Sequence, residues 1–336
     1  MITKHLTSRA AVVLVLLLAA CSTPASSQAP TPAPPDDTGE PSSAPASEPV
    51  TMRTVSVAAL PIVETSALWG AMAAGIFEEH GLELEVVPAQ GGAQAIPALL
   101  NGDIQFAIGQ PFGPFRADQQ DLGIVVLTNY ANSLEEGRDV NAVVASAASG
   151  ITDIAGLAGK RVSVNSLGAA GDVTIGAAVE AAGGDPASIE FVEVAFPDVA
   201  AQLDAGNIDA GWVPEPFVSQ IVGGGGTLVM HPYQETIPGL PLLLTFTTAD
   251  LIASDPDLVD DFSAAMADAL EWATANESDV RQAIRDNLEV PDAVADSVPL
   301  PVFTAELDKA KIEALGELAV DQGVLDALPD FDRLYR

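Results

Sequence analysis

Three short loops of this sequence combine glycines with hydroxyl, amide and carboxyl side chains, a combination suited to holding a polar ligand. The first loop contains Glu64, Thr65 and Ser66, the second Gly92, Ala93 and Gln94, and the third Ser166, Leu167, Gly168 and Ala169. The second and third loops each precede an expected helix, where backbone N–H groups without helical partners attract polar or anionic groups. These loops therefore predict a ligand-binding site. In the first loop, Thr65 or Ser66 has a simpler interpretation as the cap of the next helix.

Four further residues complete the predicted ligand-binding set: Gln110, Asn129, Trp212 and Glu215. Glu215 has two interpretations of equal weight, a ligand contact or a carboxylate held by local backbone donors near its two neighbouring prolines. Trp212 and Tyr130 could stack on an aromatic ligand or pack in the core. For Trp212 we favour the core.

The residue types that perform catalysis or bind metals do not occur in the required spacings. Beyond the first few residues, His80 and His231 are the only histidines, and neither belongs to an H-E-x-x-H pattern. The sequence has neither a G-x-S-x-G motif nor a phosphate-binding P-loop. It therefore predicts a binding protein rather than an enzyme, with no metal site and no cofactor.

The loops need strands and helices to position them, and the hydrophobic pattern predicts two such sets. The first has strands at 54–60, 82–88, 104–108 and 123–130, with helices at 65–79 and 93–101. The second has strands at 141–145, 162–164, 189–194 and 210–213, with helices at 172–182 and 199–205. A return strand at 240–247 and helices at 258–275, 277–288 and 306–322 follow, and we expect these helices to pack on the first set.

This order predicts an α/β fold with two lobes and a two-segment hinge. The chain builds lobe one (51–140), crosses to lobe two (141–238) and returns to lobe one (239–336), where the C-terminal helical part packs. Ligands of open α/β sheets bind beyond the carboxyl ends of the strands, so two facing lobes form a cleft. We expect the cleft to close over its ligand.

The N-terminus has the features of an export signal. Basic residues precede an apolar run of eleven residues, Ala10 to Ala20, which is too short to span a membrane. The run ends in Leu18-Ala19-Ala20-Cys21, which resembles the lipobox of bacterial lipoproteins. We therefore expect a signal peptide over 1–20 and a lipid on Cys21. The alternative is an ordinary secretory signal with an incidental cysteine. Because Cys21 is the only cysteine, disulfides within the chain are excluded.

Composition and net charge indicate a tether after the signal and limit the kinds of partner. Residues 21–50 are rich in Pro, Ser and Ala with almost no large apolar side chains, so we expect a disordered tether between the lipid and the folded lobes. The formal charge is −34, and removing Lys4 and Arg9 with the signal makes it about −36. This charge disfavours nucleic acid or an anionic membrane surface as a partner.

Eight short segments follow one another in a recognisable order: Gly75-Ile76-Phe77, Gly81-Leu82, Gly91-Gly92, Gly102-Asp103, Leu157-Ala158-Gly159-Lys160, 165–168, 191–194 and 209–217. Together they resemble the substrate-binding proteins of ABC importers for nitrate, sulfonates, taurine and thiamine precursors. The resemblance covers about 55–287 and implies the type II periplasmic-binding-protein fold, with ligand contacts from the loops above. It also implies a small-molecule ligand and an ABC permease with its ATPase as partners. We expect a monomer held by its lipid on the outer face of the cytoplasmic membrane.

The charges near the expected cleft bear on the class of ligand. Glu64, Asp172 and Glu215 lie there, whereas Lys160 and Arg161 begin a strand on the far side. Carboxylates repel an anion unless the ligand also carries an amine. A sulfonate or taurine-like zwitterion, or a cationic thiamine-pyrimidine-like molecule, therefore fits better than nitrate.

Two other functions are compatible with this fold. The pyrimidine synthase of thiamine biosynthesis shares it, but the export signal and the two remaining histidines disfavour that enzyme. A lipoprotein that binds the ligand to signal to a sensor, without transport, has the same sequence features. The sequence does not separate this sensor from an importer component.

Overall fold

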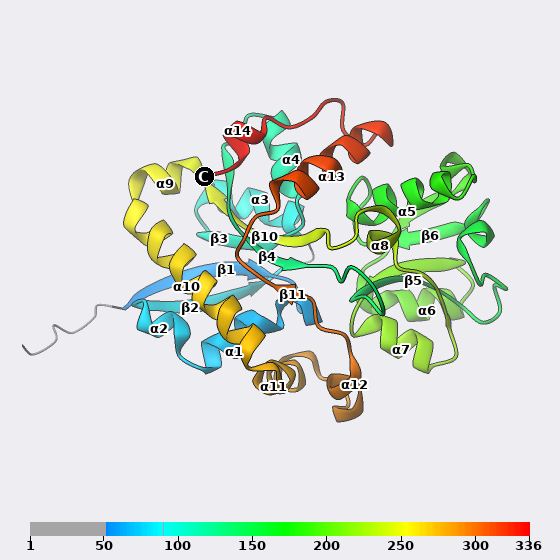
Figure 1. Ribbon diagram of the computed structural model, residues 1–336, viewed down its shortest axis with the longest axis horizontal. Helices are drawn as coiled ribbons and strands as arrows, with labels where there is room; N and C mark the ends of the chain where they lie inside the picture. Colours follow the sequence, from blue (N-terminus) through cyan, green and yellow to red (C-terminus); the bar gives the residue numbers. More distant parts are fainter. Residues whose placement is uncertain (1–51, 90) are drawn as a thin grey trace, which may run out of the picture. The chain divides into compact units, whose positions relative to one another are not determined.

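A six-stranded sheet and a five-stranded sheet form the centres of two α/β lobes (Figure 1). The structure is a computed structural model that describes residues 52–89 and 91–336. The predicted signal segment 1–20, the predicted lipidation site Cys21 and the predicted tether 21–50 lie outside the described residues. None of the helices in the described part of the chain is both long enough and apolar enough to span a membrane.

The sheet of lobe one has the strand order β11-β4-β10-β3-β1-β2. Its strands are β1 (Arg53–Ala59), β2 (Leu82–Pro88), β3 (Phe106–Gly109), β4 (Ile124–Asn132), β10 (Pro241–Thr248) and β11 (Val302–Phe303). Strand β1 pairs in parallel with β2 and β3, whereas β10 runs antiparallel to β3 and β4. The parallel strands β1, β2 and β3 therefore end at the same edge of the sheet.

The sheet of lobe two has the order β7-β6-β8-β5-β9. Its strands are β5 (Asn141–Ala145), β6 (Arg161–Val164), β7 (Glu190–Glu193), β8 (Ala210–Pro214) and β9 (Thr227–Met230). Strand β6 is parallel to β7 and β8, and β5 is antiparallel to β8 and β9. Strands β6, β7 and β8 thus also end at one edge.

The chain passes between the two sheets twice, which confirms the predicted two-segment hinge. It leaves lobe one after β4 and returns through β10, and these two strands are antiparallel neighbours. The two crossing segments are also bonded to each other, since the Ser133 N–H donates to the Leu240 carbonyl at 2.8 Å.

The helices of lobe one come from both of its chain segments. They are η1 (Val63–Thr65), α1 (Ser66–Ala73), α2 (Ile76–Glu79), α3 (Gly92–Asn101), α4 (Phe112–Gln119), α9 (Ala249–Ser254), α10 (Pro256–Ala275), α11 (Glu277–Leu288), α12 (Asp292–Ser297), α13 (Lys309–Asp321) and α14 (Phe331–Leu334). The expected helix 65–79 is divided into η1, α1 and α2. Gly75, with φ of 80°, interrupts it because a left-handed residue ends one helix before the next begins.

Lobe two has shorter helices. They are η2 (Ile154–Leu157), α5 (Ala170–Ala181), η3 (Pro186–Ser188), η4 (Phe196–Asp198), α6 (Val199–Asp204), α7 (Phe217–Gly223) and α8 (Pro232–Thr236). The sequence patterns did not predict α4, α7, α8, α9, α12 or α14. These helices have only four to eight residues, so each contributes too few turns to show a helical period.

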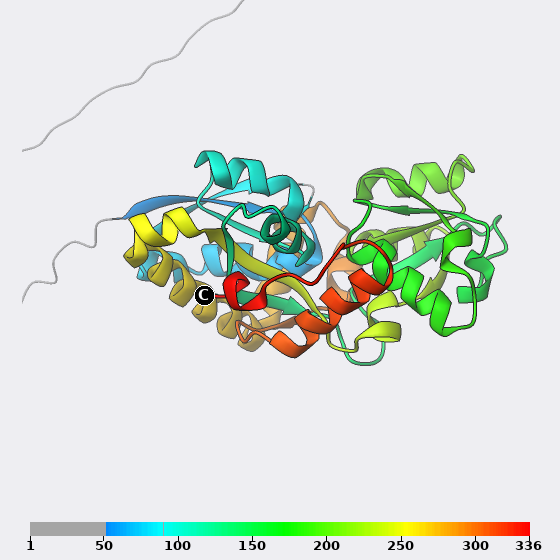
Figure 2. The same ribbon diagram turned by 90° about the horizontal axis from the view of Figure 1, so that it is seen from above.

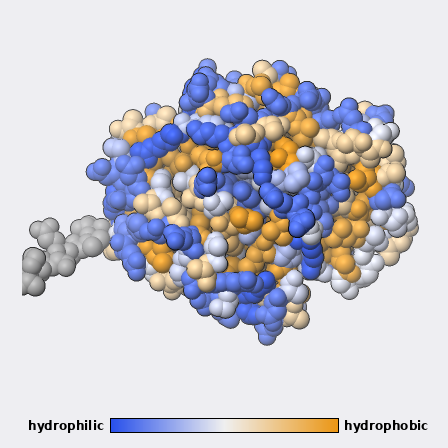
Figure 3. Space-filling view, in the orientation of Figure 1, coloured by the Kyte–Doolittle hydropathy of each residue, from blue (hydrophilic) through white to orange (hydrophobic). Residues whose placement is uncertain are grey.

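The long C-terminal helix α10 packs on lobe one, as predicted. Its Phe262 stacks on Phe106 of β3, with ring centroids 3.7 Å apart. The outer surface of this region is polar, and hydrophilic residues cover the lower edge of the face in Figure 3, where α11 and α12 lie. Helix α13 differs from the expectation, because it also contacts lobe two. In Figure 2, α13 lies beside α5. The side chain of Gln322, which follows α13, donates to Glu180 Oε2 of α5 at 2.8 Å.

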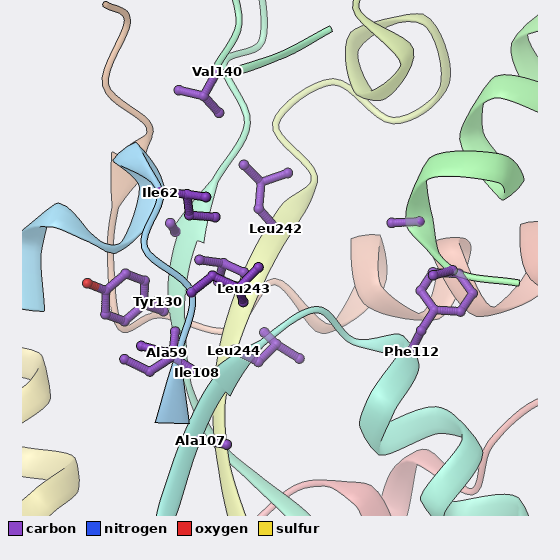
Figure 4. Close-up of a cluster of buried hydrophobic side chains, with 14 of the residues drawn as sticks. Ala59, Ile62, Ala107, Ile108, Phe112, Tyr130, Val140, Leu242, Leu243 and Leu244 are labelled. Carbon is purple, nitrogen blue, oxygen red and sulfur yellow. The ribbon is translucent and has the colours of Figure 1, made fainter. Parts of the chain in front are cut away.

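A cluster of buried apolar side chains lies beneath the edge at which the lobes meet (Figure 4). Ile62 follows β1, and Leu242 and Leu243 belong to β10 near the second crossing. Tyr130 is also fully buried, and its hydroxyl accepts a hydrogen bond from the Leu68 N–H at 2.9 Å. These contacts hold the first loop against both crossing segments. Of the two interpretations of Tyr130, they favour a core residue.

We predict that Phe262→Ala lowers the free energy of unfolding by about 3 to 5 kcal/mol, because it removes a fully buried ring and leaves a cavity against Phe106. Urea unfolding followed by circular dichroism measures the change. Glu271→Ala, at an exposed position of the same helix, is the control, with an expected change within about 0.5 kcal/mol. Equal losses for the two variants would show that α10 is not packed on β3.

Candidate functional site

A cavity of about 530 Å³ lies between the two lobes at the ends of their parallel strands. Lobe one contributes the residues after β1 and β2 together with α3, and lobe two contributes those after β6 and β7 together with α7. The residues lining it are Leu60, Pro61, Ile62, Pro88, Ala89, Gln94, Asn165, Glu193, Val194, Ala195, Phe196, Pro197, Asp198 and Phe217. We call this space the outer cavity. Its position agrees with the rule that α/β sheets bind ligands beyond their carboxyl ends.

A second, much smaller space of about 20 Å³ adjoins it and shares four of its lining residues. Its walls are Leu60, Ile62, Glu64, Gly91, Gln110, Asn141, Asn165, Phe196, Trp212, Pro214, Tyr233, Leu242 and Leu243. We call this space the inner cavity. It is mostly apolar, and its polar side chains come from both lobes.

Glu64 lies at the inner cavity and is 3% exposed. Its Oε1 accepts a hydrogen bond of 2.7 Å from Asn141 Nδ2, which joins η1 of lobe one to β5 of lobe two. The pKa of Glu64 is raised to about 8, mainly by burial and to a smaller extent by the nearby carboxyls of Asp139 and Glu215, while hydrogen bonds from the backbone and from Asn141 lower it. Glu64 is therefore mainly a neutral acid at pH 7.

Glu215 is fully buried but has its own cation. Arg138 Nη2 donates to Glu215 Oε1 at 2.7 Å. The Ser219 hydroxyl also donates to Oε1, and the Ser219 N–H donates to Oε2. Of the two interpretations of Glu215, these contacts favour the structural one. The prediction named only local backbone donors for Glu215, whereas its partners also include the side chains of Arg138 and Ser219. Glu215 lines neither cavity.

A side chain of the protein caps the N-terminus of α5, which differs from the prediction that the third loop holds a ligand there. The Asp172 carboxylate accepts hydrogen bonds from the N–H groups of Gly168, Ala169 and Val173. A negative charge already occupies the position that an anion would take. On the other lobe, Gly91 caps α3 and lines the inner cavity, so the second loop does reach the site.

The third loop has a different role, because it bonds to lobe one. Arg116 of α4 extends its Nη2 to the carbonyl oxygens of Leu167 and Gly168. Ser166, Leu167, Gly168 and Ala169 line neither cavity. The sequence did not identify Arg116, because α4 was not predicted and its basic residue had no expected position.

Four predicted ligand-binding residues line the cavities: Glu64, Gln94, Gln110 and Trp212. The remaining ones in lobe one, Thr65, Ser66, Gly92, Ala93 and Asn129, do not. The Thr65 hydroxyl bonds to the carbonyls of Leu60 and Ile62, and Ser66 is buried at the start of α1. Gly92 packs closely on Gly109, and Asn129 bonds within the sheet region to Asn132 and Thr304.

Trp212 is both a core residue and a wall of the inner cavity. It is 1% exposed and makes edge contacts with Phe196 and Tyr233, with ring centroids 5.6 and 6.0 Å apart. Sequence reasoning missed Asn141, Phe196 and Tyr233 as cavity residues. Asn141 begins β5 and Phe196 follows β7, so attention to the residues at strand ends could have identified both. Tyr233 lies on α8, a helix that the sequence pattern did not predict.

The described part of the chain contains no group of three or more His, Cys, Asp or Glu side chains arranged to hold a metal ion. Its two histidines have other contacts. His80 Nε2 lies 2.8 Å from Asp268, and His231 Nδ1 lies 2.7 Å from the Asn141 carbonyl. Neither histidine lines the cavities.

Comparisons with known proteins agree with this architecture. A family described as NMT1/THI5 like matches residues 64–279. The alkanesulfonate-binding protein SsuA from Xanthomonas axonopodis pv. citri, bound to MOPS, has a TM-score of 0.72 at 15% identity, over 87% of this chain and 99% of its own. No curated protein sequence matches the chain.

Two further structures show the range of proteins with this fold. The ligand-binding component of an ABC-type import system from Staphylococcus aureus, with zinc bound, has a TM-score of 0.72 at 12% identity, over 85% of this chain and 97% of its own. The desulfurization enzyme DszB has a TM-score of 0.62 at 18% identity, over 84% and 96% of the two chains. These likenesses confirm the predicted periplasmic-binding-protein fold.

The raised pKa of Glu64 predicts a pH-dependent stability. Because the folded state holds this proton up to about pH 8 and the unfolded chain releases it near 4.5, stability falls as pH rises through that range. We expect Glu64→Gln to gain stability relative to the unchanged protein from pH 5 to pH 8. Urea unfolding at several pH values measures the difference, and a difference that is constant over this range would contradict a neutral Glu64.

The ion pair of Glu215 predicts a non-additive pair of substitutions. Arg138→Met leaves a buried carboxylate without its cation, and we expect a loss of about 1 to 3 kcal/mol, moderated because the Arg138 side chain is 45% exposed. Adding Glu215→Gln should recover part of the loss, since the buried charge is gone. Unfolding free energies of the single and double variants test this, and strictly additive effects would contradict it.

Proposed function

Because the chain belongs to the NMT1/THI5 like family, we propose that it is a solute-binding lipoprotein that captures a small polar organic molecule and delivers it to an ABC importer. The observation that carries this proposal is the outer cavity. It lies between the lobes where two sets of parallel strands end, and its volume of about 530 Å³ suits a small ligand.

In this proposal the ligand binds as the lobes close. Lobe one comprises 51–140 and 239–336, lobe two comprises 141–238, and the crossing segments between them act as the hinge. The contacts of Arg116 with Gly168 and of Asn141 with Glu64 join the lobes and would separate on opening. Closing therefore forms new polar contacts and buries the ligand.

The walls of the outer cavity favour a ligand that carries an amine. Glu193 and Asp198 lie exposed at its rim, and no Lys or Arg is among the residues that line either cavity. Phe196 and Phe217 provide apolar surface beside them. We therefore propose a taurine-like aminosulfonate first and a thiamine-pyrimidine-like molecule second. The MOPS bound to SsuA is itself a sulfonate with an amine, which supports this order.

The further elements of the proposal are the anchor and the partners. A lipid on Cys21 would hold the protein at the outer face of the cytoplasmic membrane, and the segment 21–50 would act as a tether. An ABC permease and its ATPase would accept the ligand from a monomeric binding protein. The description of the Staphylococcus aureus structure as part of an ABC-type import system supports these partners. A sensor without transport would use the same cavity.

We predict that taurine raises the melting midpoint of the purified protein. Binding to the folded state stabilises it by RT ln(1 + [L]/Kd), about 2.7 kcal/mol at a hundredfold excess over Kd, which is a shift of several degrees. A thermal-shift panel at neutral pH would compare taurine with ethanesulfonate, an aminopyrimidine, nitrate and an aliphatic amine. The proposal fails if none of these compounds raises the midpoint.

Two matched variants test the location of the amine. Asp198→Asn removes a rim charge, whereas Asp204→Asn removes a charge at the other end of the same helix, outside both cavities. We expect the first to weaken taurine binding severalfold and the second to leave it unchanged. Equal effects in calorimetric titrations would mean that only net charge matters and that the rim does not contact the amine.

A further inference from the structure

The inner cavity contains two buried polar atoms that lack a hydrogen-bond partner. They are Glu64 Oε2 and Trp212 Nε1, and both side chains are at least 97% buried within the wall of the same cavity. An unpaired buried polar atom costs about 1 to 3 kcal/mol, so two of them in one small space require an explanation. A ligand atom that bonds to both supplies one.

The surroundings of Glu64 determine which kind of bond it can make. Its Oε1 already accepts a hydrogen bond from Asn141, and Glu64 takes part in no ion pair among the described residues. The titratable groups around it are Asp139 on the first crossing segment, Glu215 after β8 and Tyr233 on α8. None of these is a cation.

The nearby positive groups are directed elsewhere. Arg138 pairs with Glu215, and His231 contacts the backbone oxygen of Asn141 rather than Glu64. Without a cation, a buried carboxyl keeps its proton, because an unpaired ionised carboxylate would cost several kcal/mol more. Its second oxygen is then an O–H donor, and the indole of Trp212 can only donate.

We propose that the inner cavity is a subsite for one acceptor oxygen of the ligand, to which the protonated carboxyl of Glu64 and the indole N–H of Trp212 both donate. The space of about 20 Å³ has room for one water-sized atom, which matches a single oxygen of a sulfonate, carboxylate or carbonyl group. This inference rests on the proposed function and deepens it.

The subsite gives the ligand a direction. Its oxygen end points inward to Glu64 and Trp212, and its amine end points outward to the acidic rim with Asp198. Glu64 thus acts oppositely to the first expectation from the sequence, in which its negative charge disfavours an anion. As a neutral donor it selects for an acceptor.

The test is calorimetric titration of taurine at pH 6.5 and pH 9.5. Glu64→Gln is the reference, because its amide still accepts from Asn141 and still donates to the ligand but does not titrate. The ratio of the Kd of the unchanged protein to that of Glu64→Gln should rise about 30-fold between the two pH values, given a pKa of about 8 for Glu64. Asp139→Asn, which alters the neighbouring buried acid, should retain this dependence.

Trp212 has an independent readout. In a ¹⁵N-indole spectrum, taurine should shift the Trp212 resonance and leave those of Trp69 and Trp272 in place. Trp212→Phe should weaken taurine binding about tenfold at both pH values, since it removes one bond to a charged group, and Trp272→Phe should not.

The outcomes that overturn the inference differ from those that overturn the function. If taurine binds without a change in the Kd ratio and without a shift of the Trp212 resonance, the subsite is wrong and the binding function stands. If an aminopyrimidine binds instead, with an affinity that rises with pH and is lost in Glu64→Gln, Glu64 is a charged acceptor and the subsite is again wrong. If no compound of the panel binds, the proposed function fails and the subsite fails with it.

Discussion

A buried carboxyl without a cation lies where the two lobes meet, and the rest of the site is arranged around it. Glu64 follows the first strand of lobe one, and Asn141 begins the first strand of lobe two. Their hydrogen bond of 2.7 Å can form only when the lobes are together. An ionised Glu64 would be costly to bury there, so closure is compatible with the neutral acid. Closure of the lobes and protonation of one side chain are therefore linked.

Three other acids of the two lobes have partners of their own, and one of them, the fully buried Asp139, also has one oxygen without a partner. Glu215 has Arg138, and Asp172 receives the N–H groups before α5. Asp139 accepts from the N–H groups of Leu134 and Val140 within the crossing segment. Each of these three carboxyls has donors that hold the structure together. Only Glu64 combines an unpaired oxygen with a position on the wall of a cavity.

The fold was predictable from the sequence because strands and long helices leave a periodic pattern. The strand 82–88 and the helix 277–288 have the predicted bounds, and the return strand lies within one residue of its prediction. The site was predictable only in part. Strand ends indicated where the loops would lie, and they placed Glu64, Gln94, Gln110 and Trp212 on the cavity walls. Which side chains of a loop face a ligand depends on packing that the sequence does not display.

The errors have specific physical causes. The third loop has the composition of an anion-binding turn, but Asp172 caps its helix, and the sequence alone did not reveal that the carboxylate turns back onto the loop. The charge of Glu64 was misjudged because burial and the absence of a cation decide it, and both arise from contacts between residues far apart in the chain. Arg116 was missed because the short helix α4 gives no clear period. Long-range contacts, rather than local pattern, account for these differences.

The most direct measurement of the central claim is the infrared difference spectrum between the unchanged protein and Glu64→Gln at pH 7. A protonated carboxyl absorbs in a region separate from that of a carboxylate, so the spectrum reports the state of this one side chain. We predict that the difference contains the carbonyl band of a protonated acid, which disappears above about pH 8. A carboxylate band at pH 7 in its place would contradict the account, because the inner cavity would then present a negative charge to the ligand.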